Sequence, residues 1–513
     1  MNSPRVPKLA LTLLVTITSL QAADSPFKPL YPEAFPTCGC EDLLKLSLPN
    51  TTIDSATVEP SDGSCRVVAT VTHPPANDHV KIYVGLPKTN WNGRFRGTGG
   101  GGFYGGGPGN LPGPIKEGFA TGATDTGHEG GSGSFALDSS NRLNWQLIID
   151  NAYLGIHEMT VVGKTITEKY YGKPAKYSYF TGASTGGRQG LMEAQRYPED
   201  YNGIFSGCPA INWQRFVPAD GLWAQVIMND AHNFVSGAKL NAATAAAIAA
   251  CDEKDGVKDG VIDDPLHCDW DPKNLVGTKV GDETFTEADA NIVRKIWEGA
   301  RGADGKFLWY GMERGADLNA LAGTGGTPLT GKPFSIGFDY IRFYLAQDPN
   351  LDWQTVTPAR FEQMWNQSVE EFGLVIGTDN PDLSAFRDHG GKIAIFHGLA
   401  DQLIPAAGTV DYYKRVQEKM GGAKKAANFA RLFLVPGVDH GFRGPGPTPT
   451  HYFEALVNWV ENNQAPDELI GERRDKDNKL LGKRLLYPYP ATAKYKEGDP
   501  ENPQNYRHVQ NSE

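Results

Sequence analysis

Residues 177–188 read YSYFTGASTGGR, a stretch that passes from an apolar segment through glycine and serine into a polar one. Tyr177–Thr181 is predicted to be a strand, and Gly187–Tyr197 has the residue spacing of a helix. Ser184 then occupies a sharp strand-to-helix turn between two glycines, which permit tight packing. Such a turn exposes a serine hydroxyl for nucleophilic attack.

A serine nucleophile needs a histidine base and an acid that orients it, each on a loop after a core strand. Asp401 follows the predicted strand Ile393–Phe396, and His440 follows the predicted strand Arg431–Val435. Both side chains are therefore expected at the carboxyl ends of their strands. We predict a catalytic triad in which Asp401 orients His440 and His440 takes the proton of Ser184.

Other acids and histidines compete for these roles. Asp439 is the alternative acid, but a direct neighbour of the base in sequence normally points away from it. His397 and His128 are expected to be structural.

The oxyanion formed during acyl transfer needs two backbone N–H donors. Thr185, directly after the nucleophile, is predicted to supply the first, and Gly101 in the glycine run Gly99–Gly102 is predicted to supply the second. A phosphate-binding loop is the competing interpretation, but the glycine run lacks a Gly-Lys-Ser/Thr ending.

Residues 251–268 read CDEKDGVKDGVIDDPLHC, an acidic loop with a cysteine at each end. Calcium binds several carboxylate and carbonyl oxygens on a curled loop. The loop is therefore predicted to hold a structural Ca²⁺ through three carboxylates and two backbone carbonyls, from Asp252, Asp255, Asp259, Val257 and Val261. The spacing is not that of an EF-hand, zinc is disfavoured because carboxylates are hard ligands, and a solvated acidic loop is the alternative.

Six cysteines in an exported chain are expected to pair. Cys251 with Cys268 is the first predicted disulfide, because the acidic loop returns between them. The other four cysteines allow three pairings; we predict Cys40 with Cys65, which leaves Cys38 for Cys208, and a free buried Cys208 is the alternative.

The bulk properties indicate an exported protein. Residues 1–22 have the basic start, the apolar run and the small residues of a signal peptide, so secretion to the cell exterior or periplasm is expected. No later stretch is long and apolar enough to span a bilayer. The net charge is −11 with acids and bases scattered, which argues against nucleic acid as a partner. Nothing in the sequence indicates the oligomeric state.

The order of predicted elements indicates a β/α core with an insertion. Strands are expected at Cys65–Thr72, Val80–Val84 and Ile204–Ser206. Helical sequence then dominates, and strand-like runs return only at the two segments before Asp401 and His440. We predict core segments at 23–210 and 385–513 around an inserted lid domain at 211–384, which carries the acidic loop.

Several motifs, in order, resemble the tannase and feruloyl esterase family, which includes the mono(2-hydroxyethyl) terephthalate hydrolases. They are Trp91–Phe95, the glycine run, Thr124–His128, Gly182–Arg188, Tyr197–Tyr201, the acidic loop, Phe396–Asp401 and Asp439–Gly441. The resemblance implies an α/β-hydrolase core with a large inserted lid, a calcium ion in that lid, and hydrolysis of esters of aromatic acids.

One departure from this family concerns the active site. Members of the family carry cysteines just before the serine and just after the histidine, joined as a disulfide, whereas this chain has Ala183 and Gly441. The triad chemistry does not need that disulfide, because it transfers no proton and binds no oxyanion.

The expected function is that of a secreted serine carboxylic ester hydrolase that cleaves hydroxycinnamate or related aromatic esters. Gallate esters and terephthalate monoesters are the close alternatives; an acyltransferase or a non-catalytic protein that binds aromatic glycosides would be of a different class. The lid segment Phe338–Phe343 could contribute to the pocket. An arginine there that met a substrate carboxylate would favour monoester acids, whereas polar groups that bind phenols would favour gallate or ferulate.

Overall fold

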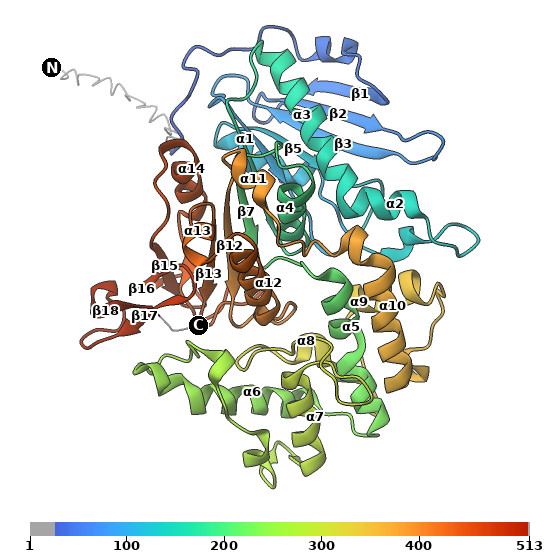
Figure 1. Cartoon of the computed structure of the whole chain (residues 1–513), viewed down its shortest axis with the longest axis vertical. Helices are drawn as coiled ribbons and strands as arrows, with labels where there is room; N and C mark the ends of the chain where they lie inside the picture. Colours follow the sequence, from blue (N-terminus) through green and yellow to red (C-terminus); the bar gives the residue numbers. More distant parts are fainter. Residues whose placement is uncertain (1–25, 511–513) are drawn as a thin grey trace, which may run out of the picture.

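The computed structural model describes residues 26–510, at whose centre lies a nine-stranded sheet (Figure 1). The predicted signal peptide, residues 1–22, lies outside the described residues. In sheet order the strands are β1 (Thr51–Val58), β2 (Cys65–Val71), β3 (Val80–Leu86), β5 (Ala120–Thr124), β4 (Arg94–Thr98), β6 (Tyr177–Ala183), β7 (Gly203–Gly207), β12 (Lys392–Gly398) and β13 (Ala430–Val435).

The strand directions place the loops that matter on one edge of this sheet. β1, β2, β3 and β5 pair antiparallel in that order, whereas each pair of neighbours from β5 to β13 is parallel. The carboxyl ends of β4, β6, β7, β12 and β13 therefore lie side by side. Residues far apart in the chain meet there, as in other open parallel sheets.

Helices cover both faces of the sheet. Its helices are α1 (Pro112–Lys116), α2 (Trp145–Ile149), α3 (Gly155–Tyr171), α4 (Thr185–Arg196), α11 (Ser384–Asp388), α12 (Ala406–Lys419), α13 (Ala423–Ala426) and α14 (Tyr452–Asn462). Buried apolar residues of α3, α4 and α12 share one cluster, whereas those of α14 pack against Phe205, Phe396 and Phe433 in another. Side chains of the central strands are thus buried on both faces.

Between β7 and β12 the chain adds no strand to the main sheet and forms a helical lid. The lid contains α5 (Trp213–Asp230), α6 (Gly237–Cys251), α7 (Glu287–Glu298), α8 (Asn319–Ala322), α9 (Ser335–Asp339) and α10 (Pro358–Ile376), with the two-residue strands β8 (Lys279–Val280), β9 (Glu283–Thr284), β10 (Thr324–Gly325) and β11 (Thr330–Gly331). Its buried apolar residues form a cluster that also includes Phe103, Ala136, Ile148 and Ala152 of the core, so the lid packs against the core. The predicted α/β core with an inserted lid is confirmed. Within residues 26–510, every helix is too short or too polar to cross a membrane.

The structure adds strands that the sequence analysis missed. After β13 the chain forms β14 (Thr448–Pro449), β15 (Leu469–Arg474), β16 (Leu480–Leu486), β17 (Ala491–Tyr495) and β18 (Tyr506–Gln510) in two small sheets. The expectation of no strand beyond 435 was wrong, because these strands are half-exposed and carry charged residues in place of an apolar run. β5 was missed because it reads ATGAT and is buried without large side chains.

Two of the three predicted disulfides are present. Cys40–Cys65 joins the turn η1 (Glu41–Lys45) to β2, and Cys251–Cys268 closes the acidic loop. The third prediction, Cys38–Cys208, was wrong, because both are free thiols. Cys38 contacts the carbonyl of Lys169 in α3, whereas Cys208 is buried after β7, so the two lie at different places in the fold.

We expect the Cys40–Cys65 disulfide to stabilise the N-terminal part of the sheet. Cys40→Ala/Cys65→Ala should lower the free energy of unfolding by about 3 kcal/mol, because this cross-link restricts the unfolded chain. Thermal melting without reductant measures this, with Cys38→Ala as the control that leaves Tm unchanged. Equal melting temperatures for the double variant and the wild type would contradict the prediction.

Candidate active site

Ser184 occupies the turn between β6 and α4. Its backbone has φ 60° and ψ −124°, a combination that costs a non-glycine residue roughly 1–3 kcal/mol. The turn closes because no side chain lies at its crossing point: a Cβ on Gly182 would come within 2.4 Å of the Gly186 carbonyl carbon. The strained geometry presents the Ser184 side chain at the carboxyl edge of the sheet, as predicted.

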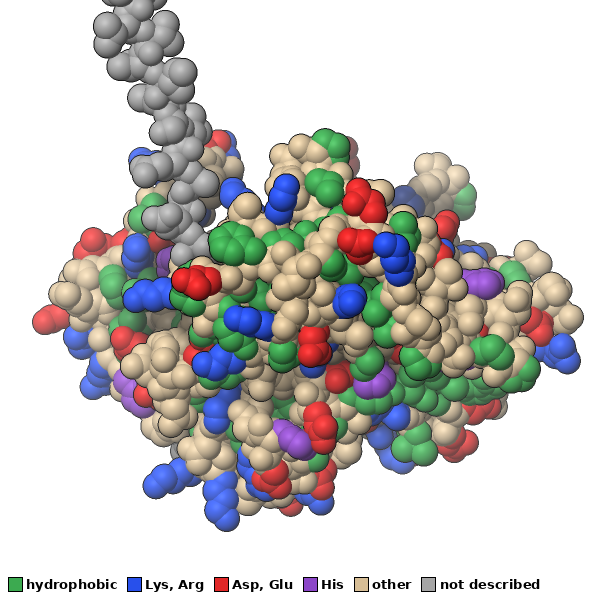
Figure 2. Space-filling model, turned by 90° about the horizontal axis from the view of Figure 1, so that it is seen from above, with side chains coloured by type: hydrophobic (Ala, Val, Ile, Leu, Met, Phe, Trp, Pro, Cys, Tyr) green, Lys and Arg blue, Asp and Glu red, His purple; other side chains and the backbone are tan. Residues whose placement is uncertain are grey.

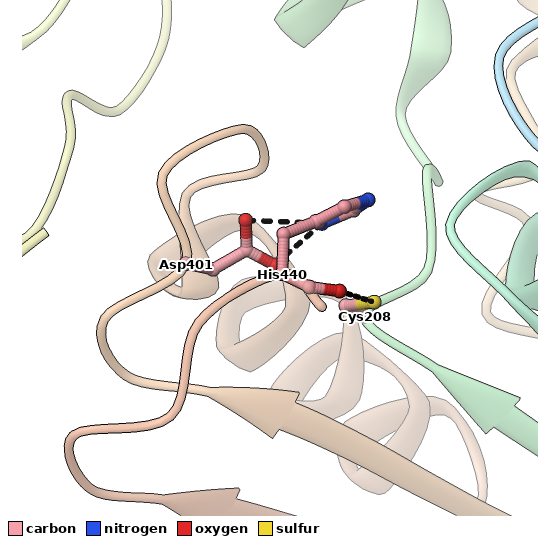
Figure 3. A group of neighbouring side chains, drawn as sticks. All are labelled: Cys208, Asp401 and His440. Carbon is pink, nitrogen blue, oxygen red and sulfur yellow. Dashed lines mark hydrogen bonds and ion pairs between the residues drawn. The ribbon is translucent and has the colours of Figure 1, made fainter. Parts of the chain in front are cut away.

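His440 and Asp401 form a hydrogen-bonded pair at the same edge (Figure 3). The His440 Nδ1 lies 2.9 Å from Oδ2 and 3.1 Å from Oδ1 of Asp401. Burial lowers the pKa of His440, but the hydrogen bonds and charges of Asp401 and Cys208 outweigh that effect, so the pKa lies above its usual value. The pair has the geometry of an acid that orients a base.

Asp401 is fully buried and surrounded by hydrogen-bond donors. The amides of Leu403 and Ile404 donate to its Oδ1 at 2.9 Å, and the His397 Nε2 lies 3.3 Å from its Oδ2. Burial raises the pKa of Asp401, but its hydrogen bonds to His397 and His440 and their charges bring the pKa well below the usual range. Asp401 is therefore a stable carboxylate that both His397 and His440 contact.

Asp439 makes different contacts. Its Oδ1 accepts the amides of Gly441 and Arg443 at 2.8 Å, which shapes the turn after His440. Asp401, and not Asp439, bonds to the imidazole. His128 is buried and stacks on Phe135, and burial lowers its pKa to about 4.

Ser184 and His440 line the same cavity, which lies between the core and the lid. Its other walls are mainly apolar. They include Trp213, Phe216 and Val217 of α5, Phe334 and Ile336 at the start of α9, and Leu403 of the loop after β12. The cavity has the apolar lining with a few polar groups that is typical of a small-molecule site.

The predicted amide donors must be revised at one position. Thr185 is the first residue of α4, so its N–H has no acceptor within the helix. Gly101 does not fit, because its N–H donates to the Tyr104 carbonyl at 2.9 Å. Gly102 lines the cavity, and its carbonyl accepts the Thr185 hydroxyl at 2.6 Å. The Gly101 amide is therefore engaged within its own turn, which a glycine run in the sequence does not reveal.

Cys208 is a neighbour of the histidine that the sequence analysis did not place here (Figure 3). Its thiol donates to the His440 carbonyl with an Sγ–O distance of 3.7 Å. The Cys208 Sγ, one carboxylate oxygen of Asp401 and one ring nitrogen of His440 all lie within 4.8 Å of one another. Burial raises the pKa of the Cys208 thiol, so it remains protonated. Because 232 residues separate Cys208 from His440, no local pattern could reveal this contact.

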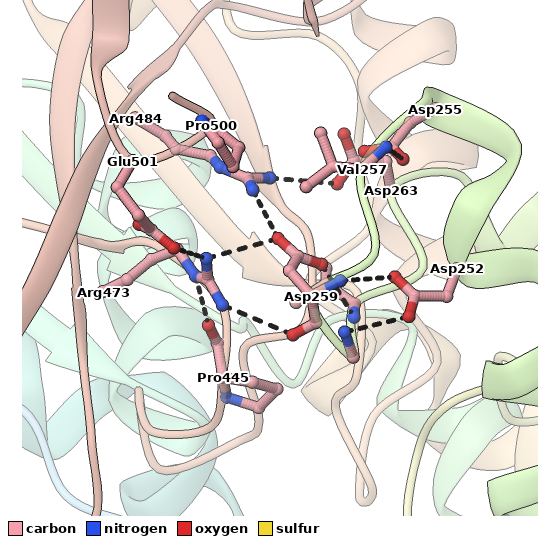
Figure 4. A network of polar contacts seen from close by, with 12 residues as sticks. Asp252, Asp255, Val257, Asp259, Asp263, Pro445, Arg473, Arg484, Pro500 and Glu501 are labelled. Carbon is pink, nitrogen blue, oxygen red and sulfur yellow. Dashed lines mark hydrogen bonds and ion pairs between the residues drawn. The ribbon is translucent and has the colours of Figure 1, made fainter. Parts of the chain in front are cut away.

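The acidic loop curls upon itself beside the C-terminal strands (Figure 4). The carboxylate of Asp252 accepts the amides of Asp259 and Gly260, each at 3.0 Å. The carboxylate of Asp255 accepts the Val257 amide at 2.9 Å, and that of Asp259 accepts the Val261 amide at 3.0 Å. The predicted carboxylates therefore organise the backbone of the loop.

Two arginines reach the loop from β15 and β16, and neither was predicted. Asp259 pairs with Arg484 and lies 3.4 Å from Arg473 (Figure 4). Asp263, also absent from the predicted set, faces Asp255, and its buried Oδ1 has no hydrogen bond, with the nearest Arg484 nitrogen 3.8 Å away. Arg484 thus faces three aspartates, Asp255, Asp259 and Asp263, while Arg473 faces Asp259 and Glu501. The carboxylates outnumber the arginines and are oxygen ligands of the kind that Ca²⁺ prefers.

Comparisons with known proteins identify the family of this chain. The family model for tannase and feruloyl esterase matches residues 65–509. A probable feruloyl esterase of Arthroderma benhamiae is 41% identical over 468 residues, which cover 88% of this chain and 85% of the relative. Feruloyl esterase B of Aspergillus niger is 29% identical over 465 residues, which cover 85% and 84% of the two chains.

Solved structures agree on the fold. The crystal structure of feruloyl esterase B from Aspergillus oryzae superposes with a TM-score of 0.81 at 27% identity and covers 92% of this chain and 99% of that one. Tannin acyl hydrolase from Aspergillus niger has the same TM-score at 24% identity, over 90% and 92% of the two chains. The fold is that of an α/β hydrolase. The chain belongs to the tannase and feruloyl esterase family and is a carboxylic ester hydrolase.

Proposed function

We propose that this enzyme hydrolyses hydroxycinnamate esters through a covalent acyl-enzyme. The observation that carries the proposal is that Ser184 and His440 line one cavity and that His440 bonds to Asp401. His440 would accept the Ser184 proton as the hydroxyl attacks the ester carbonyl, and would then donate that proton to the leaving alcohol. A water molecule, activated by His440, would release the acid.

The oxyanion would be held by the amides of Thr185 and Gly102. Thr185 supplies an N–H at a helix N-terminus, where the helix dipole also favours negative charge. Gly102 has φ +59°, and a left-handed conformation at this position is available to glycine without strain. The hydrogen bond between the Thr185 hydroxyl and the Gly102 carbonyl fixes the two residues relative to each other.

The cavity favours an aromatic acyl group without a second carboxylate. Its walls are mainly apolar, and none of the residues that line it is Lys or Arg. Arg342, which could have met a carboxylate, is paired with Asp339 at 2.7 Å. These features support a hydroxycinnamate in agreement with the names of the relatives, disfavour a terephthalate monoester, and leave gallate esters as the alternative.

The proposed setting is outside the cytoplasm. The predicted signal peptide at 1–22 and the disulfides Cys40–Cys65 and Cys251–Cys268 support export to an oxidising compartment. Acidic and basic side chains are interspersed over the face in Figure 2.

We also propose that the acidic loop binds a structural Ca²⁺. Asp255, Asp259 and Asp252 with the carbonyls of Val257 and Val261 would supply the oxygen ligands. Asp263 fits the same ion, since its buried Oδ1 has no donor of its own. The ion would neutralise the negative charge of the aspartates that Arg473 and Arg484 do not neutralise. It would stabilise the lid and take no part in the chemistry.

Replacement of the nucleophile tests the acyl-enzyme mechanism. Ser184→Ala should reduce kcat on methyl 4-hydroxycinnamate by on the order of 10⁴–10⁶-fold without a lower Tm, because only the attacking oxygen is lost. The exposed Ser140 gives the matched control, Ser140→Ala, which should keep full activity. Appreciable turnover by Ser184→Ala would assign the nucleophile to another residue.

The two candidate acids can be separated by isosteric substitution. Asp401→Asn should lower kcat by about 10⁴-fold, because an amide disfavours the imidazole tautomer that accepts the serine proton. Asp439→Asn keeps the acceptor oxygen for the Gly441 and Arg443 amides and should change kcat by less than about tenfold. Rates measured at saturating substrate decide between them, and the reverse order of effects would contradict the assignment.

Chelation tests the calcium proposal. Removal of the ion with EGTA should lower Tm more than it lowers kcat, since Ca²⁺ at 100 times its Kd contributes about 2.7 kcal/mol to stability. Asp255→Asn should abolish this response, whereas the exposed Asp269→Asn should retain it. A wild-type Tm that EGTA leaves unchanged would mean that Arg473 and Arg484 suffice to neutralise the loop.

A further inference from the structure

Asp220 is an acid in the wall of the catalytic cavity with no role in the triad. It belongs to α5 and lines the same cavity as Ser184 and His440. Its side chain is buried, with 8% of the residue exposed. Asp220 is the one lid residue with a carboxyl group among those that line this cavity, and it also lines a second pocket with Trp223 and Tyr310.

This carboxyl group has no hydrogen-bond donor among the described residues. Its Oδ2 is fully buried and unpartnered. The other buried acids nearby differ: Asp401 accepts two amides and two imidazoles, and Glu313 accepts the Ala407 amide at 2.9 Å. A buried carboxyl group without a hydrogen-bond donor destabilises the fold, so its retention in a cavity wall points to a donor on a ligand.

The charges around Asp220 restrict what that ligand group can be. Burial raises the pKa of Asp220 well above its usual range, and the negative charges of Asp401 and Glu313 raise it further. A substrate carboxylate would add one more negative charge in a cavity without a lining Lys or Arg. A neutral hydroxyl can donate to the carboxyl in either protonation state, because the carbonyl oxygen always remains an acceptor.

We propose that Asp220 is the specificity-determining residue that binds the phenolic hydroxyl of the acyl group. This inference rests on the proposed function and names the substrate class within it. The ester carbonyl lies at Ser184, the aromatic ring packs against Trp213 and Phe216 of α5, and the ring hydroxyl donates to Asp220. The enzyme thereby selects aromatic acids with a hydroxyl on the ring over those without one.

The lid residues that the sequence suggested do not compete for this role. Tyr340 is fully buried, and its hydroxyl lies 2.9 Å from Ser368 Oγ. Arg342 is paired with Asp339. Neither Tyr340 nor Arg342 lines the cavity, whereas Asp220 does.

The experiment compares kcat/KM for methyl 4-hydroxycinnamate and methyl cinnamate. The wild type should prefer the hydroxylated ester by about 10–100-fold, which is the contribution of one hydrogen bond to a buried carboxyl. Asp220→Leu should bring this ratio close to one by slowing only the hydroxylated ester, and Asp220→Asn should keep part of the preference through its amide oxygen. Glu313→Gln, which removes a buried acid near Asp401 but outside the cavity wall, should leave the ratio unchanged.

Each other outcome overturns the inference. Equal loss on both esters in Asp220→Leu would show that Asp220 acts through the charge of the triad, and a wild type without preference would show that no hydroxyl is bound. If Asp220→Leu does not fold, the Kd of the two esters for Ser184→Ala decides: about tenfold tighter binding of the hydroxylated ester supports the inference, and equal binding overturns it. A failure of the proposed function would give a different result from a failure of this inference. The wild type would then cleave 4-nitrophenyl acetate but neither of the two cinnamate esters.

Discussion

The close approach of glycine backbones at the serine turn is the constraint on which the site depends. A Cβ on Gly182 would lie 2.4 Å from the Gly186 carbonyl carbon, and one on Gly99 would lie 2.5 Å from the Gly186 Cα. The Gly186 amide also donates to the Gly100 carbonyl at 3.0 Å. This contact holds the loop after β4 against the start of α4. It thereby places Thr185 and Gly102 beside Ser184 and sustains the strained backbone of the nucleophile.

The buried carboxyl groups of Asp401 and Asp220 differ in the hydrogen-bond donors around them. Asp401 is enclosed by amides and imidazoles from the rigid loops of the core, which keep it ionised and aligned with His440. Asp220, on the lid helix α5, receives no such donors. The core therefore holds a carboxylate whose oxygens already accept hydrogen bonds. The lid, by contrast, holds a carboxyl group that lacks a donor and to which a ligand could donate. This division agrees with a scaffold that holds the catalytic groups while an inserted lid selects the substrate.

The position of His440 depends on weak contacts instead of a covalent bond. The residues next to Ser184 and His440 are Ala183 and Gly441, so no disulfide joins the two segments there. In this chain the His440 amide donates to Gln402 Oε1 at 3.0 Å, and its carbonyl accepts the Cys208 thiol. Together with Asp401, these groups hold the backbone and the ring of His440 from different sides.

The strands with branched apolar residues, the turn at Ser184, the loops that carry Asp401 and His440, and the disulfide around the acidic loop could all be predicted from the sequence. Each of these depends on local backbone preference or on short spacing. The sequence did not reveal the small-residue strand β5 or the charged strands that carry Arg473 and Arg484, because neither has an apolar pattern of its own. Three contacts could be seen only in the folded chain: the Gly101 amide bonds to Tyr104, Cys208 lies free beside His440, and Asp220 lines the cavity. These outcomes depend on which distant groups meet when the chain folds, and contacts across hundreds of residues leave no periodicity in the sequence.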